Sequence, residues 1–100
     1  MDPEKPDIQI SDVVISVRGR DQGEIFYVVG REEEFLLLAN GKNRTLEEPK
    51  RKKQKHVEKV LRSETRVAAK LLSGDKVLNG ELRRDLASLC RGMQAENRGG

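Results

Sequence analysis

The chemistry that this sequence can offer is concentrated in one run of positively charged residues. Five of the six residues from Lys50 to Lys55 are cationic, and from Lys42 to Arg62 nine basic residues stand against three acidic ones, a net charge of +6 in a chain that carries +3 overall. Cations this close together repel one another unless a polyanion or solvent takes up their field. The run therefore predicts either a phosphate-binding patch or a solvated linker, and the letters PKRKKQK would also pass as a nuclear-import signal.

A second basic element, with two arginines, lies in a segment that contains two glycines. Arg18 and Arg20 flank Gly19, and Gly23 follows after Asp21 and one further polar residue. Glycine adopts positive φ at no steric cost, and an aspartate can accept hydrogen bonds from nearby backbone amides as an Asx turn. The pattern predicts a tight connection that holds two guanidinium groups at the surface, although an ordinary hairpin turn with solvated arginines would use the same residues.

Candidate catalytic residues are few. His56 is the only histidine and Cys90 the only cysteine. A Cys-His pair can act as a nucleophile, but Cys90 falls on the apolar face of an expected helix, where a cysteine is usually a small core residue. His56 stands beside several cations and is better suited to donating a hydrogen bond to phosphate. With no Walker loop, paired catalytic carboxylates or metal-ligand cluster in the sequence, we expect no enzyme activity, no cofactor, no metal and no small-molecule substrate.

The composition is that of one small and highly charged domain. The chain has 100 residues, of which 37% are charged and 3% aromatic, and valine, isoleucine, leucine and phenylalanine number 26. That share exceeds the roughly 20% below which highly charged chains stay unfolded. No apolar run approaches the roughly 18 residues of a membrane span, and the acidic N-terminus is unlike a signal peptide. We expect a cytoplasmic protein without a membrane partner.

The first part of the chain has the pattern of β-strands. Val13, Ile15 and Val17 alternate with Val14, Ser16 and Arg18, which predicts a half-buried strand. Asn40-Gly41 is a strong signal for a type I′ hairpin, which needs positive φ at both residues. Five short strands in such a short segment predict a small curled barrel that hides its edges by closure. The strands are expected at residues 13–18, 25–29, 35–39, 42–46 and 55–60.

Two helices are expected after Leu61. Ser63 can cap a helix from Glu64 to Leu72, with Gly74 just past its end, and Asn79 can cap a second helix that reaches Arg91 and ends at Gly92. Helices this short must pack on the barrel, on each other or on a partner. The buried side chains are expected to be Leu61, Val67, Ala68, Leu71 and Leu72 for the first helix and Leu82, Leu86, Leu89 and Cys90 for the second. Arg83, Arg84, Asp85 and Ser88 are expected to face water.

The stretch VVISVRGRDQG, from Val13 to Gly23, resembles the KOW motif of ribosomal proteins and transcription elongation factors. With residues further along the chain it is similar to the bacterial KOW-domain RNA-binding proteins of Firmicutes, which resemble the archaeal and eukaryotic large-subunit ribosomal protein of the fourteen-e type. Those further residues are Val28-Val29, Leu38-Ala39-Asn40-Gly41, Arg44, Leu46-Glu47, Pro49-Lys50, Lys52-Lys53, Lys55-His56, Asn79, Glu81-Leu82-Arg83 and Leu86.

This resemblance implies an SH3-like β-barrel, and together with the strand and helix patterns it predicts a mainly β, α+β chain with four parts. They are a flexible N-terminus over residues 1–9, a KOW SH3-like β-barrel over 10–61, a two-helix appendage over 62–92 and a flexible tail over 93–100. It also implies a non-enzymatic protein that binds the backbone of ribosomal RNA, with Gly19, Asp21 and Gly23 shaping the loop. The RNA-binding candidates are Arg18, Arg20, Lys42, Arg44, Lys50, Arg51, Lys52, Lys53, Lys55 and His56.

Two departures from the KOW pattern and one alternative bear on this expectation. Phe26 stands where many KOW motifs have a glycine, and the acidic run from Glu32 to Glu34 is expected on the face away from RNA. With so few aromatic residues for base stacking, we expect recognition of RNA shape and backbone.

The alternative is a protein-interaction module that docks on RNA polymerase or an assembly partner through the leucine-rich helix. Which RNA is bound, whether the protein is a ribosome component or an assembly factor, and its oligomeric state stay open.

Overall fold

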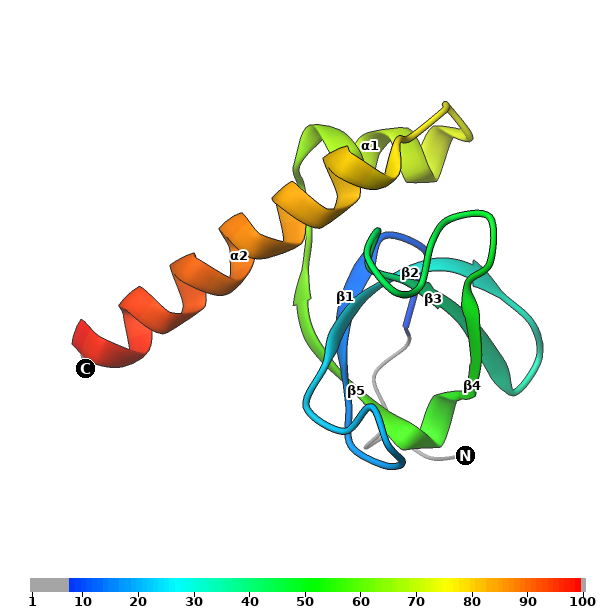
Figure 1. Ribbon diagram of the computed structural model, residues 1–100, viewed down its shortest axis with the longest axis horizontal. Helices are drawn as coiled ribbons and strands as arrows, with labels where there is room; N and C mark the ends of the chain where they lie inside the picture. The colour runs from blue at the N-terminus through cyan, green and yellow to red at the C-terminus, as the bar shows by residue number, and fades with distance from the viewer. Residues whose placement is uncertain (1–7, 100) are drawn as a thin grey trace.

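A five-stranded antiparallel sheet is followed by two helices in the computed structural model, which describes residues 8–99 and their side chains as far as residue 92 (Figure 1). The predicted α+β chain with C-terminal helices is confirmed. The strands are β1 (Asp12–Ser16), β2 (Ile25–Arg31), β3 (Phe35–Ala39), β4 (Lys50–Lys53) and β5 (Val57–Arg62). A 3-10 helix, η1 (Gln54–His56), joins β4 to β5, and the helices are α1 (Arg66–Ser73) and α2 (Asn79–Gly99).

The sheet is open but strongly bent. Its strand order is β4-β3-β2-β1-β5, so within the described residues β4 pairs only with β3, and β5 only with β1. Since β4 and β5 are consecutive in the chain yet lie at opposite edges, η1 joins the two edges, and the sheet curls round on itself (Figure 1). Register shifts between Val13 and Val14 and between Val28 and Gly30 add to the bend, as β-bulges do.

Both faces of the sheet are buried, because alternate residues point into two apolar clusters. Val13 and Val14 are adjacent on β1 and are both fully buried, so the predicted half-buried strand is wrong at this point. The inner cluster contains Ile8, Val14, Phe26, Val28, Leu36, Leu38 and Val57. The outer cluster contains Val13, Tyr27 and Ala39 from the sheet and Val67, Ala68, Leu82 and Leu86 from the helices.

The predicted strand at 42–46 is absent, and β4 is instead the basic run itself. A type I′ turn needs positive φ at both central residues, but only Gly41, with φ of +77°, has it. The Asn40 side chain accepts hydrogen bonds from the backbone of Lys42 and Arg44, at 2.9 Å and 3.0 Å, and folds the segment into a local loop. In β4 the residues that face the inner cluster are lysines, so no apolar alternation marks this strand in the sequence.

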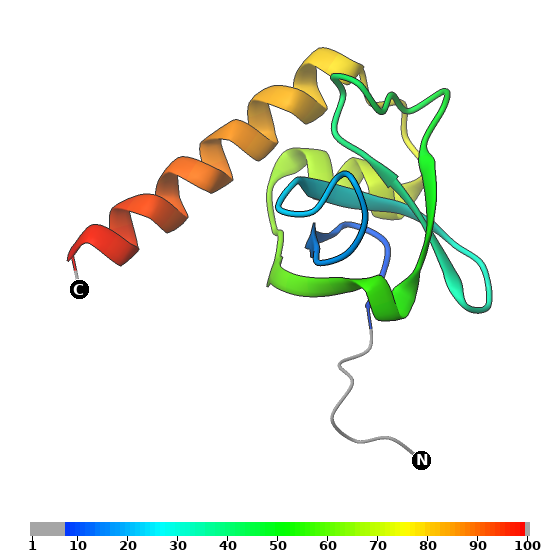
Figure 2. The same ribbon diagram turned by 60° about the horizontal axis from the view of Figure 1, so that its bottom comes forward.

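The helix ends differ from the expected ones. Thr65 caps α1 by accepting a hydrogen bond from the backbone of Ala68, while Ser63 is buried, and Leu72, expected in the buried stripe, is exposed. The predicted Gly74 does end α1, with φ of +80°. Gly92 does not end α2, which continues to Gly99 and extends away from the sheet (Figures 1 and 2). Residues 1–7 of the predicted flexible N-terminus lie outside the described part of the chain.

A buried polar network ties the helices to the sheet. The hydroxyl of Tyr27 on β2 lies 2.7 Å from Ser63 Oγ and donates to the carboxylate of Asp85 on α2, which also accepts from Thr65 at 2.8 Å. Burial, followed by the hydrogen bond to Asp85, raises the pKa of Tyr27 to about 12. Asp85, expected to face water, therefore points inward and fixes α2 against β2.

Candidate nucleic-acid interface

The ammonium group of Lys52 joins the β1–β2 loop to strand β4. Its Nζ atom donates to the carbonyl oxygen of Arg18 and to Oδ1 of Asp21, both at 2.8 Å. Only 9% of the Lys52 side chain and 12% of the Asp21 side chain are exposed. The expectation that Lys52 is a solvated cation is therefore wrong, since its charge is used inside the protein to hold the loop.

Two glycines give this loop its shape. Gly19 and Gly23 have φ of +91° and +92°, the positive values that the sequence predicts. Residues that carry a side chain rarely adopt such values. The amide of Gly23 donates to the carbonyl oxygen of Ser16 at 2.8 Å, and that of Glu24 to the carbonyl oxygen of Asp21 at 2.9 Å. The loop is thus a closed, hydrogen-bonded turn on which Arg18 and Arg20 are both exposed.

Asp21 is the anionic centre that holds the loop from the inside. Its Oδ1 also accepts from Ser16 Oγ at 2.8 Å, and Lys50 Nζ lies 3.7 Å from its Oδ2. The carboxylate thus binds side chains rather than forming the expected Asx turn. Burial on its own would raise the pKa of Asp21, but the hydrogen bonds from Lys52 and Ser16 and the charges of Lys52 and Lys50 outweigh it, so the pKa lies below its ordinary value.

On the far side of the loop, His56 of η1 sits among cations. The amide of Val17 donates to its carbonyl oxygen at 3.0 Å, which attaches the start of the loop to η1. Burial and then neighbouring positive charges lower the pKa of His56 below its ordinary value, so the imidazole is neutral at pH 7. The charges responsible are those of Arg18, Lys55, Lys52 and Lys53. The loop and the basic segment therefore lie together.

Four cations at this junction are exposed, and we refer to them as the basic surface. Arg18 and Arg20 come from the β1–β2 loop, Lys53 from the end of β4 and Lys55 from η1. None of the four has a side-chain hydrogen bond or ion pair within the described residues. They are available to an anion in solution, whereas Lys50 and Lys52 are drawn in by Asp21.

Arg51 is exposed but engaged by neighbouring side chains, so we do not count it in the basic surface. Its guanidinium lies 3.7 Å from the centre of the Phe35 ring, and its Nε donates to Glu32 Oε1 at 2.6 Å. Strand register places Arg51 on the same face of β4 as Lys53 and on the opposite face from Lys52, because consecutive residues of a strand point to opposite faces. The basic run of the sequence is therefore not one continuous patch.

The acidic turn between β2 and β3 lies beside the basic segment rather than opposite to it. The amide of Gln54 donates to the carbonyl oxygen of Glu34 at 2.8 Å, and Glu32 forms an ion pair with Arg51. The expectation that residues 32–34 occupy the face away from the cations is wrong. This turn covers part of the positive charge of β4 and limits the extent of the basic surface on that side.

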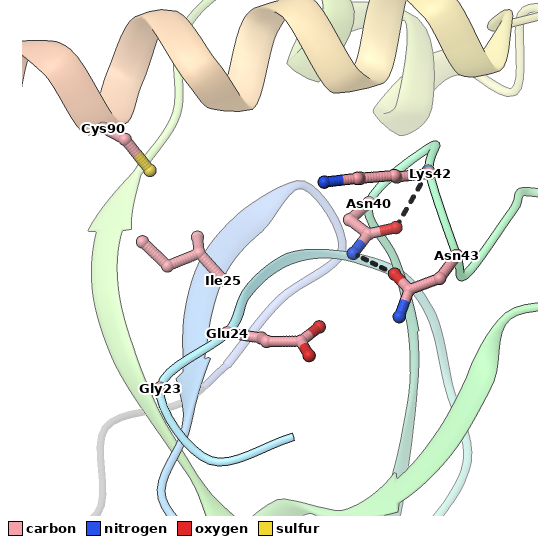
Figure 3. Close-up of a pocket in the computed structure, with 7 residues that line it drawn as sticks. All are labelled: Gly23, Glu24, Ile25, Asn40, Lys42, Asn43 and Cys90. Carbon is pink, nitrogen blue, oxygen red and sulfur yellow. Dashed lines mark hydrogen bonds between the residues drawn. The ribbon is translucent and has the colours of Figure 1, made fainter. Parts of the chain in front are cut away.

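Lys42 and Arg44 lie in the loop between β3 and β4, near α2. Lys42 is exposed and Arg44 half-buried. A cavity of about 580 Å³ separates this loop from the end of the β1–β2 loop, with Glu24 and Lys42 on its rim and Cys90 of α2 at its other side (Figure 3). The two cations are thus set apart from the basic surface by this cavity.

Some residues that shape the site carried no signal in the sequence. Ser16 reads as an outward position of a strand, yet its hydroxyl donates to the carboxylate of Asp21. Glu24 sits at the end of a loop among several charged residues, and only the fold brings it to the same cavity as Lys42. Both depend on the path of the β1–β2 loop, which the glycine spacing indicates without fixing where its side chains point.

Comparison with known proteins gives no family for this chain: no protein-family model matches it, and no curated protein matches it. Two further findings concern the described residues. None of their helices is long and apolar enough to cross a membrane. Among residues 8–99, no group of three or more histidine, cysteine, aspartate or glutamate side chains is placed to hold a metal ion.

Proposed function

We propose that this protein is a non-enzymatic RNA-binding protein of the KOW type, which contacts the backbone of ribosomal RNA in the cytoplasm through the basic surface. The resemblance in the β1–β2 loop suggests the class, and the arrangement of the cations supports it. The proposal includes the SH3-like barrel that this resemblance implies, and the strong bend of the sheet, with η1 joining its two edge strands, supports it.

The observation that carries the proposal is the bond of Lys52 to both Arg18 and Asp21. This buried contact fixes the backbone of the loop against β4, so the arginines of the loop and the lysines of the basic segment keep a constant spacing. Because the backbone that carries these cations is already ordered, phosphate binding does not have to order the loop, and only the side chains lose conformational entropy.

Phosphate neutralisation would supply most of the affinity. Each cation that contacts a phosphate of unpaired RNA releases condensed counterions and contributes about −0.7 to the slope of log K against log salt. Contacts from the members of the basic surface, Arg18, Arg20, Lys53 and Lys55, give a slope of about −2.8. The affinity should then fall roughly fiftyfold between 50 and 200 mM salt.

A salt titration tests the proposal. Fluorescence anisotropy with a labelled RNA hairpin that carries an unpaired loop gives the dissociation constant at each KCl concentration. We expect the steep slope for the wild-type protein and a slope shallower by about 1.4 for Arg18→Gln/Lys53→Gln. RNA binding that is absent at 50 mM KCl, or that does not change with salt, would refute the proposal.

A second candidate function, docking on a protein partner such as RNA polymerase or an assembly factor, has one observation in its favour. Leu72, in the last turn of α1, is 65% exposed, and Leu78, directly before α2, is 57% exposed. A complex formed through these leucines should survive 500 mM salt, since apolar burial is not screened, whereas binding to phosphates should be lost.

A further inference from the structure

A cavity between the β1–β2 loop and the β3–β4 loop combines charged and apolar walls. It has a volume of about 580 Å³, within the usual range for ligand pockets, and it is lined by Glu24, Lys42, Asn43, Ile25 and Cys90, among others. The Glu24 carboxylate and the Lys42 ammonium flank the cavity on one side, and Ile25 and Cys90 lie across from them (Figure 3). The cavity thus offers an acceptor, a donor and an apolar wall.

The two charged groups of the cavity, on Glu24 and Lys42, are free to bind a ligand. Within the described residues, neither the Glu24 carboxylate nor the Lys42 ammonium has a hydrogen-bond or ion-pair partner. The Asn40 side chain, in contrast, is engaged within its own loop, because its Oδ1 accepts from the Lys42 amide and its Nδ2 donates to Asn43 Oδ1 at 2.8 Å. It stiffens the loop that carries Lys42 and leaves the amide donors of Asn43 free.

The position of the cavity relates it to RNA. Glu24 ends the β1–β2 loop that begins with Arg18, and the backbone bond from the Glu24 amide to Asp21 makes that loop one rigid turn. An RNA strand whose phosphates lie on the basic surface would therefore pass the mouth of the cavity. Unpaired bases are read through their Watson–Crick edges, and an apolar wall can contact a base face.

Among the four bases, guanine alone presents two adjacent donors, N1–H and the N2 amino group, next to an acceptor, O6. A carboxylate can accept both donors, and lysine donates to O6. Adenine and cytosine would direct a ring-nitrogen lone pair at the carboxylate, and uracil offers a single donor. Resting on the proposed RNA-binding function, we propose that this cavity holds an unpaired guanine base of the bound RNA, with Glu24 accepting from N1–H and N2–H and Lys42 donating to O6.

The test compares labelled single-stranded RNA hexamers that differ at one position, measured by anisotropy at 100 mM KCl. The hexamer with guanine should bind roughly tenfold more tightly than those with adenine or inosine, since inosine lacks the N2 amino group. Glu24→Gln should remove this preference and leave the salt slope unchanged. Glu58→Gln is the control: it removes the same charge from an exposed position on β5, away from the cavity lining, and should keep the preference.

The outcomes separate this proposal from the function on which it rests. Equal binding of guanine and adenine hexamers with a steep salt slope would refute the cavity assignment and leave RNA binding intact, while no RNA binding would refute both. Guanosine monophosphate is added as a competitor, because a free nucleotide offers the same edge. Competition only at concentrations far above that of the hexamer supports guanine within RNA, and competition at equal concentrations would overturn it in favour of a free nucleotide.

Discussion

Lys52 and Lys53 are the same residue type at consecutive positions of β4, yet one is bound inside the protein and the other is exposed to solvent. The ammonium of Lys52 is buried against Asp21 and the backbone of Arg18, while Lys53 is exposed and has no partner among the described residues. The alternation of a strand causes the difference, because Lys52 shares a face with Leu36 of the inner cluster and Lys53 shares the other face with Phe35. A count of charges in sequence therefore overstates the charge that is available to a ligand.

The largest effect is expected on stability, when the charge of Lys52 and that of Lys53 are reversed in two separate variants. Lys52→Glu would place a second carboxylate against the buried Asp21 and lower the free energy of unfolding by about 3 to 5 kcal/mol. Lys53→Glu removes an exposed charge and should change it by less than about 0.5 kcal/mol. Urea unfolding of both variants measures the difference, and equal stabilities would show that the Lys52 contact does not hold the loop.

RNA affinity, unlike stability, should depend on the exposed cations. Lys53→Gln and Lys55→Gln should each make the salt slope shallower by about 0.7, because each removes one phosphate contact. Arg51→Gln should leave the slope unchanged, since its guanidinium is engaged by Phe35 and Glu32. Anisotropy titrations at four salt concentrations measure the slopes, and a loss with Arg51→Gln equal to that with Lys53→Gln would show that Phe35 and Glu32 do not withhold Arg51 from the RNA.

A smaller effect is expected on the stability of the protein at acid pH. Because the folded-state pKa of Asp21 lies below its ordinary value, this carboxylate stabilises the folded protein above about pH 4 and loses that contribution as the pH falls through the lowered pKa. The wild-type protein should therefore lose stability more steeply between pH 5 and pH 2 than Asp21→Asn, which has no such proton to bind. Unfolding in urea across this range, with Glu58→Gln as the exposed control, gives the comparison. Parallel curves for wild type and Asp21→Asn would count against the buried ion pair.

The smallest effect is expected at the acidic turn. Glu32→Gln removes the partner of Arg51 in a pair whose side chains are 58% and 46% exposed, so stability should change by less than about 0.5 kcal/mol. RNA affinity should rise by about threefold at most, because one repulsive charge is lost and Arg51 is released near the basic surface. The same anisotropy assay measures this, and a decrease in affinity would indicate that the acidic turn helps to bind the ligand.

The sequence predicts the elements that local signals define. Phe35–Ala39 is a continuous apolar run, and its bounds as a strand match the structure. Gly19 and Gly23 have the positive φ that their spacing indicates, and Gly74 ends α1. In each case the residues that determine the outcome are neighbours in the chain.

The sequence does not predict features that depend on distant contacts. Asn40-Gly41 fails to form a hairpin because its loop docks on α2 instead: a side chain at Gly41 would collide with the backbone of Asn79, and the Leu46 amide donates to Asn79 Oδ1 at 2.8 Å. Asp85 has the spacing of a water-facing residue, but it binds Tyr27, which lies 58 residues away in the sequence. Likewise, the burial of Lys52 depends on Asp21, 31 residues away.

An RNA titration followed by amide chemical shifts tests the account most directly. Addition of the unlabelled RNA hairpin to the ¹⁵N-labelled protein at 50 mM KCl should shift the amides of Arg18, Arg20, Lys53 and Lys55 together, and the shifts should disappear at 500 mM KCl. The amides of Leu72 and Leu78 should stay in place. Shifts that are confined to the α1–α2 turn, or that involve the loop without the basic segment, would contradict the claim that Lys52 joins the two into one surface for RNA.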